Sequence, residues 1–329
     1  MNGLQVSPFI AALPKVELYV HIKGTLTPAL RWKLALRNNE VHGDTGAPTF
    51  LETYFAGTQV LCREEDFYEL GMAYLEKAAG MNIRYAEPFF DLQAYLPRGV
   101  PAATVLNGYM RAQREGAARF GVRSNWILCF IRDRSVEEGI AAYEAARLGP
   151  DPGGNEYDRP PMLFEKAFQM AKQDGLHVTM HCDVDQKDAA DHVHEAIFTV
   201  LGGQGTERID HGLNALDRPE LLRGLQERGI PLTLCPHAYH RRQATDVLFP
   251  KLRQLWDLEG VKWCINSDDP TYMHDVWIDG AMEKFYHYCN MSKADMVQLS
   301  RDAVEISWAD EELKTELLRE LERFGRDNC

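Results

Sequence analysis

The stretch that decides the fold runs from Leu13 to Gly24 and reads Leu-Pro-Lys-Val-Glu-Leu-Tyr-Val-His-Ile-Lys-Gly. Apolar residues lead into Tyr19, His21 and Lys23, which alternate with apolar neighbours in the pattern of a β-strand. These three side chains then share one face of the strand. Charged groups are rarely buried without a partner, so this face is either a solvated edge or the lining of a site.

The rest of the chain alternates short apolar runs with longer helical patterns, which is typical of repeated β-α units around a parallel sheet. Further strands are expected at residues 81–88, 123–131, 176–182, 208–212, 231–236 and 261–270. Another strand is due between residues 149 and 161, but that segment has no apolar run, so the strand is either vestigial or the barrel is open there.

We therefore predict a single-domain (β/α)8 TIM-type barrel over residues 1–329, with its fourth strand degraded. A helix is expected to start at Thr27-Pro28, because threonine is a good N-cap and proline suits the first helical position. A polar loop at 39–50 and a helical pattern at 50–61 follow, and further amphipathic helices close the chain at 277–289, 292–305 and 309–325.

Composition narrows the class of partner. The net charge of −13 argues against nucleic acids and anionic membranes as main partners, which leaves a small-molecule substrate. Seven cysteines at wide spacing, with no CxxC pair, indicate reduced thiols in a cytoplasmic protein. No secretory signal is evident at the N-terminus, and no segment has the length of a membrane span.

Polar residues recur where the predicted strands end. In a β/α barrel these ends meet at one face, where active sites lie, so we expect the side chains to form one site. The residues concerned are His21, His181, His211, Cys235, His237, Asp268 and Asp269. Two imidazoles and a carboxylate suit a cation such as Zn²⁺, which lowers the pKa of a bound water to near neutral. A further histidine can stabilise the hydroxide or move its proton.

The motifs at these positions carry a resemblance to a known family. The opening stretch with Thr25 and Leu26, then Arg-Ile-Asp-His-Gly (208–212), Leu-Cys-Pro (234–236) and Asn-Ser-Asp-Asp-Pro (266–270), occur in family order. Together they resemble the adenosine and adenine deaminases of the amidohydrolase superfamily, in particular a divergent, fungal-like branch of deaminase-related proteins. The resemblance covers about residues 13 to 305.

The resemblance implies a mononuclear zinc site and assigns roles to individual residues. His21, His181 and Asp268 would be the metal ligands. His211 would act on the attacking water, with Asp268 also orienting it, and Asp269 would hold the N7 side of a purine. Two further residues, Asp183 and Glu87, are candidates for substrate contacts. Glu87 lies at the end of the second strand, where it either lines the site or pairs with a cation.

Several positions depart from the family pattern. Tyr19 stands where the first histidine of the HxH motif belongs, and Lys23 stands where the family has an acidic residue near the substrate. On the strand face of His21, its ammonium would repel a dication. Val184 replaces the expected general-acid glutamate, and Ala238 and Tyr239 replace a small polar pair.

These departures leave three functions open. The first is a zinc-dependent aminohydrolase acting on a purine-like or other N-heterocyclic amine. The second is a repurposed barrel in which Tyr19 and Lys23 become the catalytic pair of a lyase, cyclase or isomerase of specialised metabolism, because a desolvated lysine can act as base or nucleophile. The third is a non-catalytic protein that kept the fold.

Overall fold

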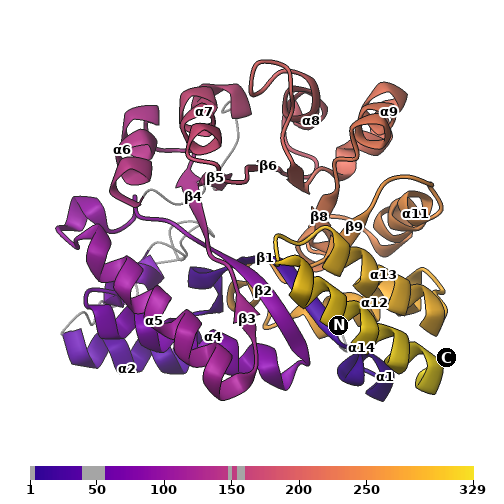
Figure 1. Ribbon diagram of the computed structural model, residues 1–329, viewed down its shortest axis with the longest axis horizontal. Coiled ribbons are helices and arrows are strands. Elements are labelled where there is room, and N and C mark those ends of the chain that lie inside the picture. The colour runs from indigo at the N-terminus through magenta and orange to yellow at the C-terminus, as the bar shows by residue number, and fades with distance from the viewer. Residues whose placement is uncertain (1–3, 39–55, 147–149, 154–159) are drawn as a thin grey trace.

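The computed structural model describes residues 4–38, 56–146, 150–153 and 160–329. Its parallel strands lie at the centre with helices around them (Figure 1). One sheet has the order β1 (Lys15–His21), β2 (Ile83–Phe90), β4 (Ile127–Ile131), β5 (Pro150–Gly153), with β3 (Arg123–Ser124) also paired to β2. The other has the order β6 (Thr179–Cys182), β7 (Arg208–His211), β8 (Leu232–Leu234), β9 (Trp263–Ile265). A parallel bridge between Val20 and Asp268 joins β1 to the segment after β9.

The strand predicted at 123–131 is interrupted. Both β3 and β4 pair with β2, so they occupy one position in the barrel, and Asn125 and Trp126 separate them. The Trp126 indole turns aside to stack on Tyr109, with ring centroids 4.7 Å apart, and donates a hydrogen bond of 3.1 Å to Ser124 Oγ. With β3 and β4 counted together, eight strand positions complete the predicted (β/α)8 order.

The fourth strand exists in spite of its sequence. Residues of β5 pair in parallel with Leu128 to Ile131 of β4, so the strand is present, whereas β5 and β6 end two separate hydrogen-bonded sheets. Backbone hydrogen bonds alone define a strand, which is why the missing apolar run did not prevent it. The predicted loop at 39–50, and the helical pattern at 50–61 up to residue 55, lie outside the described residues.

Helices precede the first strand and connect the later ones. They include α1 (Pro8–Ala12), α2 (Pro28–Asn38), α4 (Glu64–Gly80), α5 (Ala102–Phe120), α6 (Val136–Ala146), α7 (Glu165–Gln173), α8 (Ala189–Phe198), α9 (Pro219–Arg228), α10 (Pro236–His240) and α11 (Thr245–Trp256). The expected helix start is confirmed, because Thr27 Oγ1 accepts a hydrogen bond of 3.3 Å from the Leu30 amide. Of the helices described, none combines the length and apolar character needed to cross a membrane.

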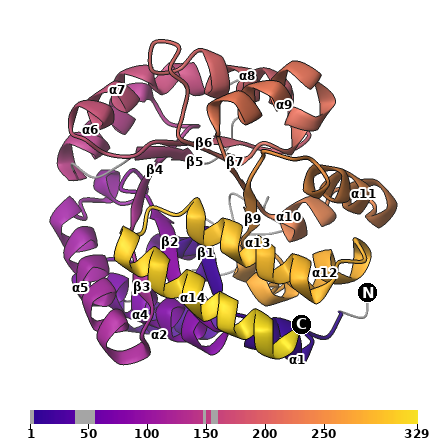
Figure 2. The ribbon, with the colours of Figure 1, turned by 45° about the vertical axis from the view of Figure 1, so that its right-hand side comes forward.

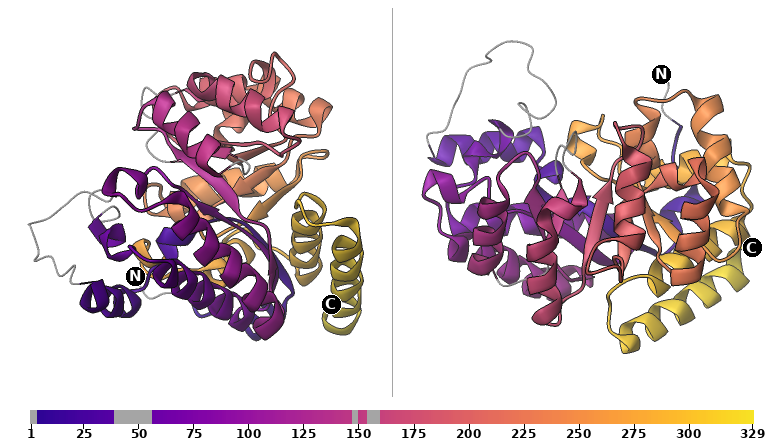
Figure 3. Two further views of the ribbon diagram at one scale, coloured as in Figure 1. Left: turned by 60° about the vertical axis from the view of Figure 1, so that its left-hand side comes forward. Right: turned by 90° about the horizontal axis from the view of Figure 1, so that it is seen from above.

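Three helices close the chain as expected: α12 (Ile278–Tyr288), α13 (Lys293–Glu305) and α14 (Glu311–Asn328). Figure 2 shows α13 and α14 side by side, and Figure 3 shows them outside the ring of strands. The turn before α14 is fixed to the barrel interior. The Trp308 amide donates a hydrogen bond of 2.6 Å to Glu87 of β2, and the Arg208 guanidinium lies 4.0 Å from the Trp308 ring centroid.

The first strand ends earlier than its alternation predicts. β1 stops at His21, and Ile22–Thr25 form the 3-10 helix η1, so Lys23 does not lie on the strand face of His21. The turn brings Gly24 against Asp269, where a Cβ would overlap the carboxylate. Glycine at position 24 is therefore required by this close approach of η1 to the segment after β9.

Glu17 anchors the middle of β1. Its fully buried carboxyl accepts hydrogen bonds from the Ser267 amide (3.0 Å), the Ser267 hydroxyl (2.5 Å) and the Tyr74 hydroxyl (2.8 Å). Burial raises the pKa of Glu17 from 4.5 to about 7, although the hydrogen bonds from Ser267 and Tyr74 oppose the shift. Between these two values the folded state holds a proton that the unfolded chain releases.

This shift predicts how stability depends on pH. Because the folded pKa of Glu17 is the higher one, its contribution to the free energy of unfolding is largest at pH values below 4.5 and falls as the pH rises through about 7. The fall is about 3 kcal/mol at about 1.4 kcal/mol per pKa unit. Urea unfolding of the wild type and Glu17→Gln at acidic and mildly alkaline pH measures it. The free energy of unfolding of the wild type minus that of Glu17→Gln should decrease from acidic to alkaline pH. A value that does not change with pH would contradict the assignment.

Candidate active site

The strand ends bring three histidines together around one phenol. The Tyr19 ring centroid lies 5.1 Å from that of His21, 6.1 Å from that of His181 and 4.9 Å from that of His211. The rings of His181 and His211 meet edge to face at 4.6 Å. His21 ends β1, His181 lies in β6 and His211 ends β7, so three strands deliver these side chains to the same end of the barrel.

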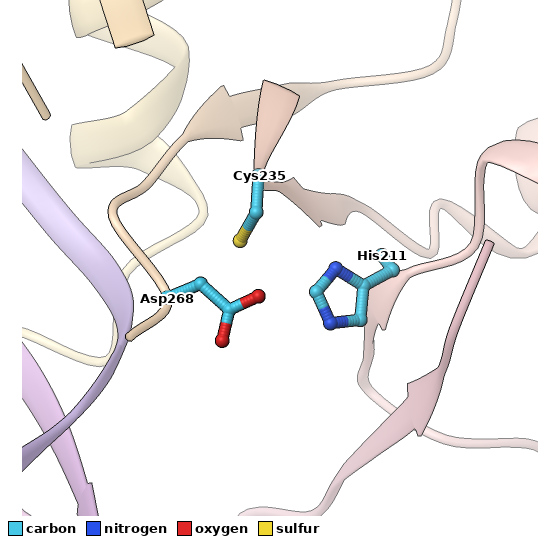
Figure 4. A group of neighbouring side chains, drawn as sticks. All are labelled: His211, Cys235 and Asp268. Carbon is cyan, nitrogen blue, oxygen red and sulfur yellow. The ribbon is translucent and has the colours of Figure 1, made fainter. Parts of the chain in front are cut away.

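Asp268 reaches the same place from β9. The backbone of this residue bonds to β1 on both sides, since the His21 amide donates to the Asp268 carbonyl (3.0 Å) and the Asp268 amide donates to the Tyr19 carbonyl (3.2 Å). Side-chain ligand atoms of His211, Cys235 and Asp268 all lie within 4.8 Å of one another, and all three residues are buried. Figure 4 shows the Cys235 thiol, the Asp268 carboxyl and the His211 ring turned toward a common centre.

Two of these residues adopt a backbone conformation that non-glycine residues rarely use. His211 has φ of 65° and Asp268 has φ of 67°, both in the left-handed region. Such conformations cost about 1–3 kcal/mol and occur preferentially at functional sites. The strained turns place both side chains at the ends of β7 and β9.

Burial and like charges shape the electrostatics. Burial, followed by the nearby His181, Lys23 and His211, holds the pKa of His21 well below its usual range, so this imidazole is neutral. Burial, followed by the neighbouring Asp269 and Asp183 carboxylates, raises the pKa of Asp268 well above its usual range. Neutral imidazole nitrogens and a carboxyl surrounded by other carboxyls form a centre that a cation would stabilise.

Tyr19 occupies the position of a metal ligand in the family pattern. Its hydroxyl lies 2.9 Å from His21 Nε2 and its side chain is fully buried. The phenol oxygen of Tyr19 is thus within hydrogen-bond distance of the imidazole nitrogen of His21. The structure gives Tyr19 a direct place in the site, next to Phe89 at a centroid distance of 4.8 Å.

Lys23 has a partner that the sequence did not reveal. Its Nζ lies 2.5 Å from Asp91 Oδ2, and both side chains are almost fully buried. Asp91 also accepts a hydrogen bond of 3.0 Å from the Ala94 amide. This ion pair and the position of Lys23 in η1 weaken the repulsion of a dication that was expected from a lysine on the strand face, although its charge still acts on His21.

The loop after β6 is tied to the loop after α10. Arg242 donates two hydrogen bonds of 2.8 Å to the Asp183 carboxylate, and Gln243 bonds to Asp185. Burial would raise the pKa of Asp183, but Arg242 and the nearby His211 and His181 lower it to about 2. Val184, between the two aspartates, is buried and apolar. Asp183 is thus held ionised by Arg242.

Glu87 lies in the barrel interior, fully buried. Its carboxylate accepts hydrogen bonds from Arg208 (2.5 Å), from the Tyr85 hydroxyl (3.0 Å) and from the Trp308 amide (2.6 Å). Of the two alternatives for this residue, the structure realises the ion pair. Protein groups already occupy both oxygens, so these contacts do not support the substrate-binding role.

His237 and His240 belong to a separate cluster. Lys284 Nζ lies 2.6 Å from His237 Nδ1 and 3.4 Å from His240 Nδ1, and His237 Nε2 bonds to the Met273 carbonyl at 2.8 Å. Neither histidine is in the group formed by His211, Cys235 and Asp268.

The donor set fits a transition-metal dication. Zinc binds imidazole, thiolate and carboxylate groups, and His211, Cys235 and Asp268 offer these three kinds of donor within 4.8 Å of one another. This group overlaps with the predicted ligands His21, His181 and Asp268 only at Asp268. His21 and His181 nevertheless lie next to Tyr19 in the same site. The ligand set His21, His181 and Asp268 therefore stays a prediction.

Sequence reasoning missed two members of the site. Cys235 follows a strand end, as expected, but no role was predicted for its thiol, which lies with His211 and Asp268. Tyr239 was noted only as a departure, yet its hydroxyl lies 2.8 Å from His211 Nδ1. The signal for Tyr239 was its position four residues after Cys235, because a short helix there turns the side chain back toward the strand end.

Comparisons with known proteins show the family and the fold. The adenosine deaminase family profile matches residues 14–324. An uncharacterised deaminase of Schizosaccharomyces pombe is 37% identical, over 97% of this chain and 98% of the relative. The crystal structure of adenine deaminase from Arthrobacter aurescens superposes with a TM-score of 0.86 at 30% identity, over 96% of this chain and 100% of that one. A Burkholderia ambifaria amidohydrolase with bound zinc gives a TM-score of 0.85 at 25% identity, over 99% and 96% of the two chains. The chain belongs to the adenosine deaminase family.

Proposed function

We propose that this protein is a metal-dependent aminohydrolase that exchanges the exocyclic amine of a purine-like or other N-heterocyclic substrate for oxygen. The observation that carries the proposal is the meeting of His21, His181, His211 and Asp268 around Tyr19 at one end of the barrel. The likeness to an adenine deaminase over nearly the whole chain supports the purine-like class of substrate.

The roles follow from what each side chain offers. Zinc, held by His21, His181 and Asp268, would make water a nucleophile near neutral pH. His211 would hold the attacking water through a ring nitrogen, and the Asp268 carboxyl would orient it. Asp269, held against Gly24, accepts a hydrogen bond from the substrate ring. Water adds to the amine-bearing carbon and the C–N bond breaks. One proton of the water leaves with the amine as ammonia, and the other stays on the product, on its oxygen or a ring nitrogen.

A second candidate is a non-hydrolytic reaction in which Tyr19 is the acid or base. It is favoured by the position of the Tyr19 hydroxyl, 2.9 Å from His21 Nε2 in the middle of the site, together with the apolar Val184. The partner proposed for Tyr19 was Lys23, whose ion pair with Asp91 gives it a structural task instead.

The cysteines support a reducing, cytoplasmic location. The seven cysteines are spread widely along the chain, and five of them are buried. Buried thiols without disulfides are typical of proteins from compartments where thiols stay reduced.

Ammonia release tests the function. Adenine, adenosine and their N6-substituted and phosphorylated forms are offered to protein purified without chelator, and the product is analysed after reaction in ¹⁸O-labelled water. We expect ammonia from at least one purine, one labelled oxygen in the product, and loss of turnover with a chelator that zinc reverses. Amine loss without labelled oxygen would replace this function by the second candidate. No turnover by metal-loaded protein across a broad panel of heterocyclic amines would contradict both.

A further inference from the structure

Tyr239 is the buried side chain in contact with His211 that the proposed roles leave unexplained. It lies in α10, directly after β8, and is fully buried. Within the described part of the chain its hydroxyl has two hydrogen-bond partners: the Cys235 amide at 2.9 Å and His211 Nδ1 at 2.8 Å. The phenol therefore connects the backbone at one strand end to the imidazole at another.

The direction of these two bonds is determined by their chemistry. An amide N–H only donates, so the phenol oxygen accepts from Cys235. The phenol O–H then has to donate, because buried hydroxyls rarely go without an acceptor. The partner that remains is His211 Nδ1, which must carry a lone pair to accept this bond.

This places the single proton of a neutral His211 on Nε2, since the other nitrogen is occupied as an acceptor. Figure 4 shows the two ring nitrogens of His211 on the edge that faces Asp268 and Cys235. We propose that Tyr239 is a positioning residue that holds His211 in the Nε2–H tautomer, so that the ring enters the site as a hydrogen-bond donor.

The consequence for catalysis rests on the proposed aminohydrolase function. In this tautomer the Nε2–H group donates a hydrogen bond to a lone pair of the attacking oxygen and so holds and polarises it. His211 cannot take a proton from the water at Nε2, because that nitrogen already carries one. Of the two roles open to this histidine, stabilising the nucleophile or moving its proton, Tyr239 selects the first. Loss of such a supporting hydrogen bond typically lowers activity about 10- to 100-fold.

Nitrogen NMR of histidine tests the tautomer directly. Protein with ¹⁵N-labelled histidine is studied without substrate, and the signals that disappear in His211→Asn are assigned to His211. We expect a protonated Nε2 and an unprotonated Nδ1 in the wild type. Tyr239→Phe should lose this pattern and lower kcat about 10- to 100-fold with a smaller change in KM. Tyr143→Phe, which removes a hydroxyl bonded to Asp174 on the outer layer, is the matched control and should keep it.

A wild-type His211 protonated at Nδ1 would overturn the proposal, and so would a tautomer unchanged in Tyr239→Phe. If that variant does not fold, the wild-type spectrum alone decides. Because the spectrum needs no turnover, an absence of purine hydrolysis would contradict the proposed function and leave the tautomer to be decided separately.

Discussion

Replacing Asp268 with asparagine is expected to lower kcat/KM for the amine substrate by about 10²- to 10⁴-fold, the range typical for loss of an acid–base group. Asparagine has the same shape, but it cannot carry the charge that a cation would stabilise, nor accept a proton from water. The buried position of Asp268 within 4.8 Å of His211 and Cys235 makes bulk water a poor substitute.

Asp185→Asn is the matched control for this substitution. Asp185 is exposed, also has a positive φ, and bonds to Gln243 on the neighbouring loop. The Asp185→Asn variant should keep activity within about tenfold, because Asp185 lies in the loop after β6 and not in the group of His211, Cys235 and Asp268. Ammonia release under steady-state conditions measures both. An Asp268→Asn protein as active as the control would remove the carboxylate from the mechanism.

Replacing Lys23 with methionine is expected to lower the free energy of unfolding by about 3–5 kcal/mol, because it leaves the Asp91 carboxylate buried without its cation. The double variant Lys23→Met/Asp91→Asn should recover most of this loss. The new asparagine side chain keeps an oxygen for the Ala94 amide, and no buried charge remains at the pair. Urea unfolding of the wild type, both single variants and the double variant measures the coupling.

The double variant also tests whether Lys23 takes part in the chemistry. If Lys23 serves mainly to pair with Asp91, the folded double variant should retain ammonia release within about tenfold of the wild type. A stable but inactive double variant would instead assign Lys23 to the chemistry, as the repurposed-barrel alternative requires. Equal stability of the Lys23→Met variant and the wild type would contradict the buried ion pair itself.

The sequence predicted the parts of the site that depend on strand order alone. His21, His181 and His211 come together because parallel strands deliver their carboxyl ends to one face, and that holds whatever the side-chain details. The comparisons with known proteins confirm the predicted fold and family. The interruption of the third strand and the pairing of β5 were not predicted, because backbone pairing at these places does not depend on apolar periodicity.

Side-chain partners were harder to predict because they depend on register and on distant segments. Lys23 pairs with Asp91, which lies far along the chain after β2, and nothing near Lys23 in the sequence indicates that contact. The same holds for Glu87 and Arg208. Tyr239 looked like the loss of a polar pair, whereas its hydroxyl returns a polar group to His211 from the short helix after β8.

The proposed function requires a metal centre built from these strand ends, and anomalous X-ray scattering at the zinc edge tests for it most directly. In crystals of protein purified without chelator and active in ammonia release, the account predicts one strong peak within bonding distance of His21, His181 and Asp268. An active crystal form with no peak at that position, or with its metal outside the barrel mouth, would contradict it.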